Sequence, residues 1–130
     1  MLSRFRKVEG EKGFTWVELL IVIAITSILA AIAIPQFGAY KDRAYNIDTK
    51  NSLQNLFLAC KAYWEENGAT STCTAAGVTN ATFGYTSSAT ITIAEGTDGS
   101  KTGFKATATN SAGGNAAGYG IDSNGTISEL

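Results

Sequence analysis

One uninterrupted apolar run near the N-terminus constrains the fold of this 130-residue chain more than any other feature. It extends from Phe14 to Ile34 and contains a single charged residue, Glu18. As an α-helix this run is about 31 Å long, which matches the ~30 Å hydrocarbon thickness of a bilayer. The sequence therefore predicts a helix that spans a membrane.

The charges that precede this run form a targeting pattern. Lys and Arg total 10 against 11 Asp and Glu, so the whole chain has a net charge of −1 and no basic footprint for nucleic acid. Residues 1–13 nevertheless hold Arg4, Arg6, Lys7 and Lys12 against two glutamates, a local charge of +2. A basic head before an apolar run is typical of a segment directed to a membrane.

A helical pattern continues beyond the apolar run. Pro35 lacks a backbone donor and crowds the carbonyl of Ala31, so we expect a kink or a local break there. Asn67 and Gly68 supply a stop signal. We therefore expect a helix of about 50 residues whose second half is amphipathic. Its apolar residues, which we interpret as one stripe, are Phe37, Tyr40, Ala44, Ile47, Leu53, Leu56, Phe57, Cys60, Tyr63 and Trp64.

The chain after Gly68 is rich in Thr, Ser, Ala and Gly, and short runs of strand-forming residues alternate with turn signals. We expect a small antiparallel sheet whose apolar face packs on the amphipathic half of the helix. Residues 95–102 and 121–127 read as turns, and residues 110–118 as a longer, flexible loop. The candidate strands are "TFGYTS" from Thr82, "ATITIA" from Ala89, "GFKATAT" from Gly103, "GYGID" from Gly118 and "GTISEL" from Gly125.

Two cysteines, Cys60 and Cys73, are the only ones in the chain. They follow the apolar run, on what we expect to be the exported side, where disulfides form and persist. A bridge across a loop of this size contributes roughly 3 kcal/mol in the chain-entropy model. The alternative interpretation is a pair of reduced, buried thiols.

The carboxylate of Glu18 is costly where it stands, since an ionised side chain in a spanning segment costs at least ~2.5 kcal/mol. One interpretation is that Glu18 lies near the headgroups and reaches water. The other requires a cation, and no Lys or Arg occurs between Phe14 and Ile34. Cleavage between Gly13 and Phe14 would create an α-amine with an ordinary pKa of about 8. Copies stacked with an axial shift could then pair this amine with the carboxylate of a neighbour.

The stretch "KGFTWVELLIVIAITSILAAIAIPQFGAYKDRAYN" resembles the N-terminus of type IV pilins and of the related pseudopilins of type II secretion. The resemblance rests on the basic leader, the Gly-Phe junction, the glutamate four residues after Phe14, the apolar run and Pro35. It implies the pilin fold, which is α+β, with a long N-terminal helix packed on a small antiparallel sheet. The implied domains are a cleaved leader over 1–13, a transmembrane and assembly helix over 14–35, an amphipathic helix over 36–68 and a C-terminal β-sheet part over 69–130.

The resemblance also implies partners and roles. A prepilin peptidase would cut between Gly13 and Phe14, the new amine of Phe14 would be N-methylated, Glu18 would direct assembly and Pro35 would kink the helix. Assembly machinery would extract the subunit from the bacterial inner membrane into an extracellular helical homopolymer. Adhesion, motility, DNA uptake and electron transfer all remain open as roles of such a filament. Extended backbone between about Thr26 and Pro35 is expected in the polymer.

Three alternatives remain open at this point. The first is a pseudopilin of a type II secretion system, which would share the same N-terminus. The second is an ordinary secretory signal with a small-x-small cleavage site at residues 31–33. The third is a membrane-anchored binding module that never polymerises.

The bridge between Cys60 and Cys73 would depart from the usual pattern of the pilin family. It would tie the end of the helix to the next loop, whereas the disulfide of pilins commonly closes a distal loop.

Enzymatic chemistry has no support in the sequence. The chain contains no His, which removes the usual general base, most zinc sites and the common hydrolase triads. We predict no catalytic residue, no cofactor and no metal. Asp122, Asn124 and Glu129 could suggest a calcium loop, but a plain hairpin turn explains them and the third carboxylate is missing.

Overall fold

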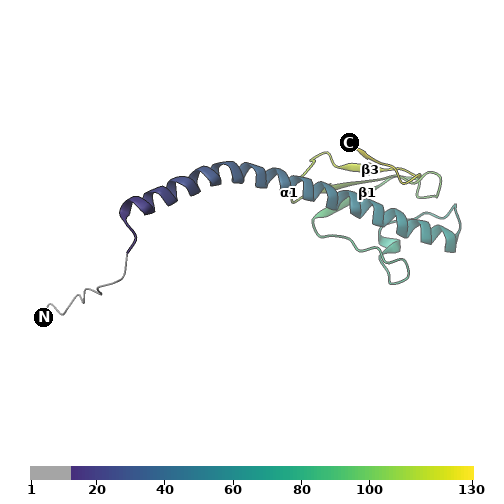
Figure 1. Cartoon of the computed structure of the whole chain (residues 1–130). Helices are drawn as coiled ribbons and strands as arrows, with labels where there is room; N and C mark the ends of the chain where they lie inside the picture. The colour runs from purple at the N-terminus through teal and green to yellow at the C-terminus, as the bar shows by residue number, and fades with distance from the viewer. Residues whose placement is uncertain (1–12) are drawn as a thin grey trace. The chain divides into compact units, whose positions relative to one another are not determined.

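A computed structural model describes residues 13–130 of the chain (Figure 1). The chain divides into two compact units, Met1–Phe37 and Gly38–Leu130. The element order is one long helix, one short 3-10 helix and four strands. The predicted leader, apart from Gly13, lies outside the described residues.

The helix α1 spans Trp16–Asn67 and contains 52 residues, so the prediction of one helix of about 50 residues is confirmed. It ends where the stop signal was expected. The backbone N–H of Gly68 donates to the carbonyl of Trp64, and Gly68 has a φ of +96° that favours glycine. The hydroxyl of Ser71 donates to the carbonyl of Asn67 and satisfies one of the last carbonyls of the helix.

The four strands form one antiparallel sheet in the order of the sequence, a meander. Ile91 pairs with Asn110, Ala106 with Ile121, and Ile121 with Ile127. The sheet confirms four of the five candidate strands, although β2 begins three residues later than predicted. The strands are β1 (Ile91–Glu95), β2 (Ala106–Asn110), β3 (Tyr119–Ile121) and β4 (Ile127–Glu129), and a short 3-10 helix, η1 (Ala76–Val78), precedes them.

The strand predicted from Thr82 is wrong. Residues 82–87 form turns and irregular backbone, because the side chain of Asn80 accepts hydrogen bonds from the N–H groups of Thr82 and Phe83 and curls the chain. The two aromatic residues of this segment act as separate anchors. Phe83 packs edge-on against Tyr63, and the hydroxyl of Tyr85 shares a hydrogen bond with Ser52.

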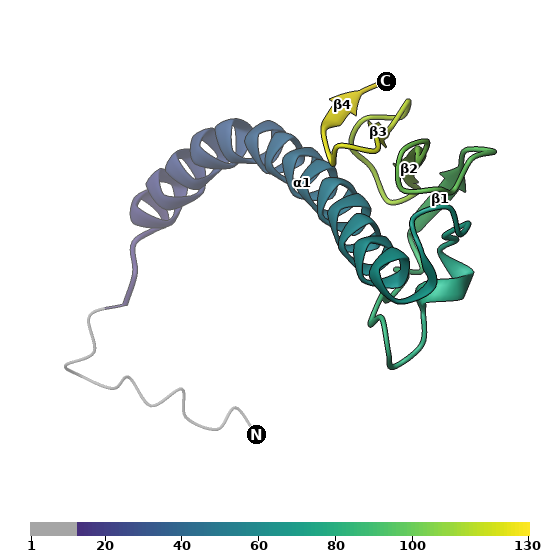
Figure 2. The same ribbon diagram turned by 90° about the vertical axis from the view of Figure 1, so that its right-hand side faces the viewer.

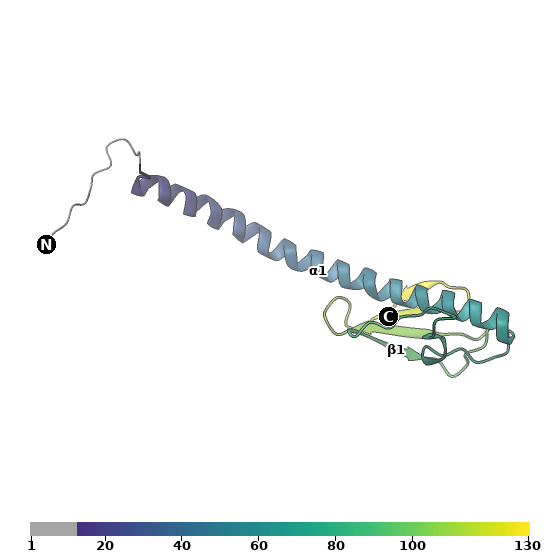
Figure 3. The same cartoon turned by 90° about the horizontal axis from the view of Figure 1, so that it is seen from below.

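The core of the second unit lies between one face of α1 and one face of the sheet (Figures 2 and 3). Phe104 sits beside both Phe57 and Trp64, with ring centroids 6.0 and 5.4 Å away. The inward residues of β2 are buried and alternate with half-exposed threonines, as the period-2 pattern predicted. We expected Leu53, Leu56, Phe57, Tyr63 and Trp64 to cover the sheet, and four of them are buried in the core as predicted. Tyr63 is only partly buried and packs on Phe83, outside the sheet.

The single apolar stripe that we expected along the amphipathic half of α1 is wrong. Leu53 and Leu56 are fully buried, whereas Tyr40 and Ile47 are 62% and 59% exposed. Successive helix residues turn by about 100°, which places Tyr40 and Ile47 on the opposite side of the helix from the core. The helix therefore has two apolar faces, and the sheet covers only one.

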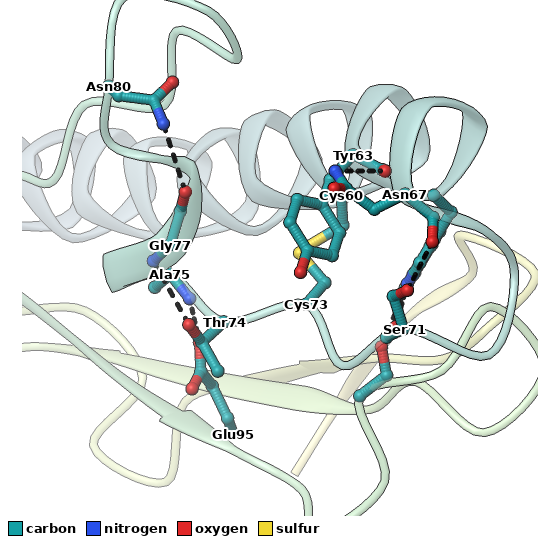
Figure 4. Close-up of a disulfide and its surroundings, with 12 residues drawn as sticks. Cys60, Tyr63, Asn67, Ser71, Cys73, Thr74, Ala75, Gly77, Asn80 and Glu95 are labelled. Atoms are coloured by element: carbon teal, nitrogen blue, oxygen red, sulfur yellow. Dashed lines mark hydrogen bonds between the residues drawn. A yellow bond between two sulfur atoms is a disulfide. The ribbon is translucent and has the colours of Figure 1, made fainter.

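The disulfide between Cys60 and Cys73 is present, which confirms the predicted pairing (Figure 4). Both cysteines are buried, and their Cα atoms are 5.7 Å apart. The bridge ties the last turns of α1 to the loop that follows. The indole N–H of Trp64 strengthens the same junction, because it donates to the carbonyls of Ser71 and Gly99 at 3.0 Å each.

An ion pair on the surface joins the same end of α1 to the loop between β1 and β2. The ammonium of Lys101 donates to Glu65 at 2.8 Å. This hydrogen bond, together with the positive charge of Lys101, lowers the pKa of Glu65 below its ordinary value. Both side chains are well exposed, so the pair contributes little to stability.

The loop over residues 110–118, which we predicted to be flexible, is held against α1. The backbone N–H of Asn115 donates to the side-chain oxygen of Asn46 at 2.7 Å, and that of Gly114 donates to the carboxylate of Asp42 at 3.3 Å. Gly113 and Gly114 allow this approach, because a Cβ at either position would collide with the side chain of Tyr45 or Asn46. The loop thus extends the contact between the sheet and the helix.

The turn between β3 and β4 gives a direct test of hairpin geometry. Gly125 has a φ of +82°, and a Cβ at this position would lie 2.6 Å from the ring of Phe57. We expect Gly125→Ala to lower the free energy of unfolding by roughly 1–3 kcal/mol, because strain and overpacking add. Urea unfolding of the detergent-solubilised chain measures this. Ser123→Ala in the same turn is the control, and equal stability of the two variants would contradict the prediction.

Candidate assembly site

The predicted cleavage site lies in exposed, non-helical chain. Gly13, Phe14 and Thr15 precede the first residue of α1, and the side chain of Phe14 is 91% exposed. The scissile bond predicted between Gly13 and Phe14 is therefore open to solvent in this unit. Cleavage and N-methylation at Phe14 stay predictions.

Thr15 and Glu18 cap the start of α1. The backbone N–H of Thr15 donates to Oε2 of Glu18 at 2.7 Å, and the backbone N–H of Glu18 donates to Oγ1 of Thr15 at 3.2 Å. This reciprocal pair is a capping box, which satisfies two backbone donors at the helix N-terminus. The arrangement places the carboxylate of Glu18 over the first turn, close in sequence to the amine that cleavage would create.

The sequence interpretation missed the role of Thr15. Its signal was present, because a Thr followed three residues later by Glu before an apolar run is the pattern of a capping box. The capping box gives Glu18 a structural role beside the electrostatic one that the sequence predicts. It does not remove the charge, since the carboxylate remains exposed and carries an oxygen with no hydrogen bond within the described residues.

The segment that follows is apolar and exposed on all sides. By length and composition α1 can cross a membrane, and no residue of the span that qualifies is buried within the described part of the chain. Its polar side chains bond to their own helix: Thr26 donates to the carbonyl of Val22 at 2.9 Å, and Ser27 to that of Ile23 at 2.6 Å. These hydroxyls therefore add little cost to burial in lipid. The exposed large side chains are Trp16, Val17, Leu19, Leu20, Ile21, Val22, Ile23, Ile25, Ile28, Leu29, Ile32 and Ile34.

Pro35 lies inside α1, and the helix has no break there in this single chain. Its ring nitrogen carries no N–H, so one backbone hydrogen bond of the helix is missing at this position. The kink at Pro35 and the extended backbone expected in the polymer stay predictions.

The residues considered for calcium serve the hairpin instead. The carboxylate of Asp122 accepts hydrogen bonds from the N–H groups of Asn124 and Thr126, each at 2.9 Å. Glu129 accepts one from the side chain of Asn115 at 3.1 Å. Within residues 13–130, no group of three or more His, Cys, Asp or Glu side chains could hold a metal ion.

Comparisons with known proteins point to the same N-terminal segment. Residues 10–34 match the model of the prokaryotic N-terminal methylation motif. The type IV major pilin protein PilA of Myxococcus xanthus is 46% identical over 65 residues, which cover 50% of this chain and 29% of that protein. The fimbrial protein EcpC of Eikenella corrodens is 36% identical over 90 residues, or 68% of this chain and 59% of that protein.

A fimbrial protein of Neisseria meningitidis is 40% identical over 73 residues, which cover 55% of this chain and 43% of that protein. In each of these relatives the matched part is less than two thirds of the relative's own length. No solved structure gives a significant match.

The fold and the site define a class: an apolar N-terminal helix with a methylation motif, continued into a helix that packs on a small antiparallel sheet. The methylation motif and the relatives, which are named type IV pilin or fimbrial protein, support a type IV pilin.

Proposed function

We propose that this chain is a structural, non-catalytic subunit of a type IV pilus, an extracellular filament built from many copies. The single observation that carries the proposal is the lone carboxylate of Glu18 at the start of an exposed apolar helix, within the methylation motif. Such a helix has to be covered by lipid or by copies of itself. In the filament, copies of the same helix cover it.

Processing at the membrane is the first step of the proposal. A prepilin peptidase cuts between Gly13 and Phe14, and methylation of the new amine keeps its positive charge. The segment 14–35 anchors the subunit in the bacterial inner membrane, while residues 36–68 and the sheet of residues 69–130 stay outside the lipid. Exposed, non-helical backbone at Gly13 and Phe14 supports access by the peptidase.

Charge pairing drives the second step. In a copy that enters the filament with an axial shift, the carboxylate of Glu18 meets the terminal amine of a neighbour, away from water. Two poorly solvated charges are thereby replaced by a pair, and an unpaired copy is penalised. The assembly machinery performs the extraction from the membrane, and the pairing sets the register.

The pseudopilin alternative is not favoured, because the relatives are named as major pilins and fimbrial proteins. The two functions differ in the product, since a pseudopilin would build a short periplasmic structure. The apolar N-terminal helix fits both.

Isolation of filaments tests the proposal directly. Filaments sheared from the cells that express this chain should be long and extracellular, and mass spectrometry should find a subunit that begins at a methylated Phe14. Cells from which the gene has been deleted are the control. Mature protein that retains Met1, or cells that carry the chain but no filament, would overturn the proposal.

A further inference from the structure

The sheet does not cover the second apolar face of α1 within the unit Gly38–Leu130, although Asn55 and Leu58 line a groove with the segment 83–86. Figures 2 and 3 show the sheet on one side of α1 only. Tyr40, Ile47 and Leu58 are 62%, 59% and 53% exposed on the opposite side. Together with smaller exposed residues they form the outer stripe, which consists of Tyr40, Ala44, Ile47, Asn51, Asn55, Leu58 and Ala62.

The outer stripe has the spacing of a helix-packing seam. Its members recur every three or four residues, so they stay on one side of the helix over several turns. None of them is charged, although charged residues are frequent in this half of α1. Seams between packed helices combine such apolar positions with a few polar ones, and a buried Asn often fixes their register. Asn51 and Asn55 would have this role here.

The two edges of the outer stripe carry mostly opposite charges. Arg43 and Lys61 lie on one edge, and Asp48 and Glu66 lie on the other, which also holds Lys41. Each basic residue precedes an acidic one by five positions, a separation that does not bring side chains together on a single helix. Among residues 13–130 the only ion pair joins Glu65 and Lys101, so Arg43, Lys61, Asp48 and Glu66 form no ion pair there, although the charge of Lys61 also acts on Glu65.

We propose that the outer stripe is the surface on which two membrane-anchored copies of this chain pair side by side, in parallel and at the same height, before they polymerise. The inference rests on the anchoring step of the proposed function. Copies anchored in one membrane have the same orientation and depth, so the anchor itself enforces a parallel pair without axial shift. The pair is symmetric, and each outer stripe packs on the other.

Charge complementarity favours a second, parallel copy of the chain as the partner of the outer stripe. In a parallel symmetric pair, the basic edge of one helix faces the acidic edge of the other, so Arg43 faces Asp48 of the second copy and Lys61 faces its Glu66. In an antiparallel pair, edges of like charge would meet. Exposed ion pairs contribute little to affinity, so they set the orientation more than the strength. Confinement in a membrane raises the effective concentration, and a modest interface then suffices.

Disulfide trapping in membranes tests the pairing. Leu58→Cys, in the full-length chain, places a free thiol in the outer stripe, since Cys60 and Cys73 are already bridged. Glu18→Ala is added to prevent polymerisation, so that filament contacts cannot produce the cross-link. We expect a disulfide-linked dimer at least fivefold more abundant than with Thr92→Cys, an exposed position on β1. Equal yields from the two cysteine positions would overturn the proposal.

Charge reversal tests the orientation. Arg43→Glu should lower the Leu58→Cys dimer by roughly threefold or more, because two symmetric contacts become repulsive. The double change Arg43→Glu with Asp48→Arg should restore the yield of the dimer. If Arg43 had only a structural role within its own chain, the second change would not restore it. A yield indifferent to all of these charges would overturn the parallel arrangement. If wild-type cells form no filaments but the Leu58→Cys variant still gives dimers, the proposed function is rejected and the pairing is not.

Discussion

Replacement of Glu18 by alanine is expected to abolish surface filaments while the subunit is still cleaved, folded and held in the membrane. An ionised carboxylate within a spanning segment costs at least ~2.5 kcal/mol, and pairing with a neighbouring amine offsets this cost in the filament. Loss of the pairing would weaken the addition of each subunit by roughly 60-fold. The measurement is the mass of sheared filaments relative to the membrane pool of cleaved subunit.

Two further variants separate the charge of Glu18 from its role in the capping box. Glu18→Gln removes the charge but keeps an oxygen that can accept the hydrogen bond from the N–H of Thr15. Thr15→Val keeps the charge and removes the hydroxyl of the cap, at a cost of about 1 kcal/mol. We expect Glu18→Gln to lose filaments and Thr15→Val to keep them. Normal filaments from Glu18→Gln would refute the charge-pairing mechanism.

Removal of the disulfide is expected to have the largest effect on stability. Replacing both Cys60 and Cys73 by alanine should lower the free energy of unfolding by roughly 3 kcal/mol, because the unfolded chain regains the freedom of the closed loop. The loop after α1 would also loosen its contact with Trp64, whose indole bonds to the carbonyls of Ser71 and Gly99. Urea unfolding of the detergent-solubilised chain, followed by Trp fluorescence, measures the loss.

Alanine is the sound replacement here, since serine would bury two hydroxyl groups among apolar neighbours. Thr92→Ala, an exposed change on β1, is the matched control. The reduced wild type should unfold at the same lower urea concentration as the double variant. A double variant as stable as the oxidised wild type would show that the contacts of Trp64 alone hold the end of α1.

Much of the fold could be predicted from local patterns. The apolar run, the end of α1 at Asn67 and Gly68, and the hairpin at Gly125 each depend on a few neighbouring residues whose chemistry admits one conformation. The cysteine pairing was also predictable, because the chain offers only one partner for each thiol. At the candidate assembly site, the sequence singled out Glu18 as the one charge of the apolar run. Its hydrogen bonds with Thr15 follow the capping-box pattern, which was also present in the sequence but was not recognised there.

Other features could not be predicted because they depend on what lies opposite in space. Residues 82–87 have strand-forming residues but no partner strand, and Phe83 and Tyr85 are instead drawn one at a time onto α1. β-propensity expresses fit to a half-buried surface, so it fails where no neighbouring strand supplies one. The loop over residues 110–118 is held by Asp42 and Asn46, two residues distant in sequence.

The sequence by itself determined which residues of this chain are apolar, where its long helix ends, and where the lone charge of its apolar run stands, since helix termination and solvation depend on the local chain. Only the tertiary structure decided that the apolar residues of the second half of α1 divide between two faces. A sheet of four short strands can cover one side of a helix, so Leu53 and Leu56 became core while Ile47 and Leu58 stayed exposed. Periodicity gives the direction in which each side chain points from the helix axis, but only tertiary packing decides which of these side chains are buried.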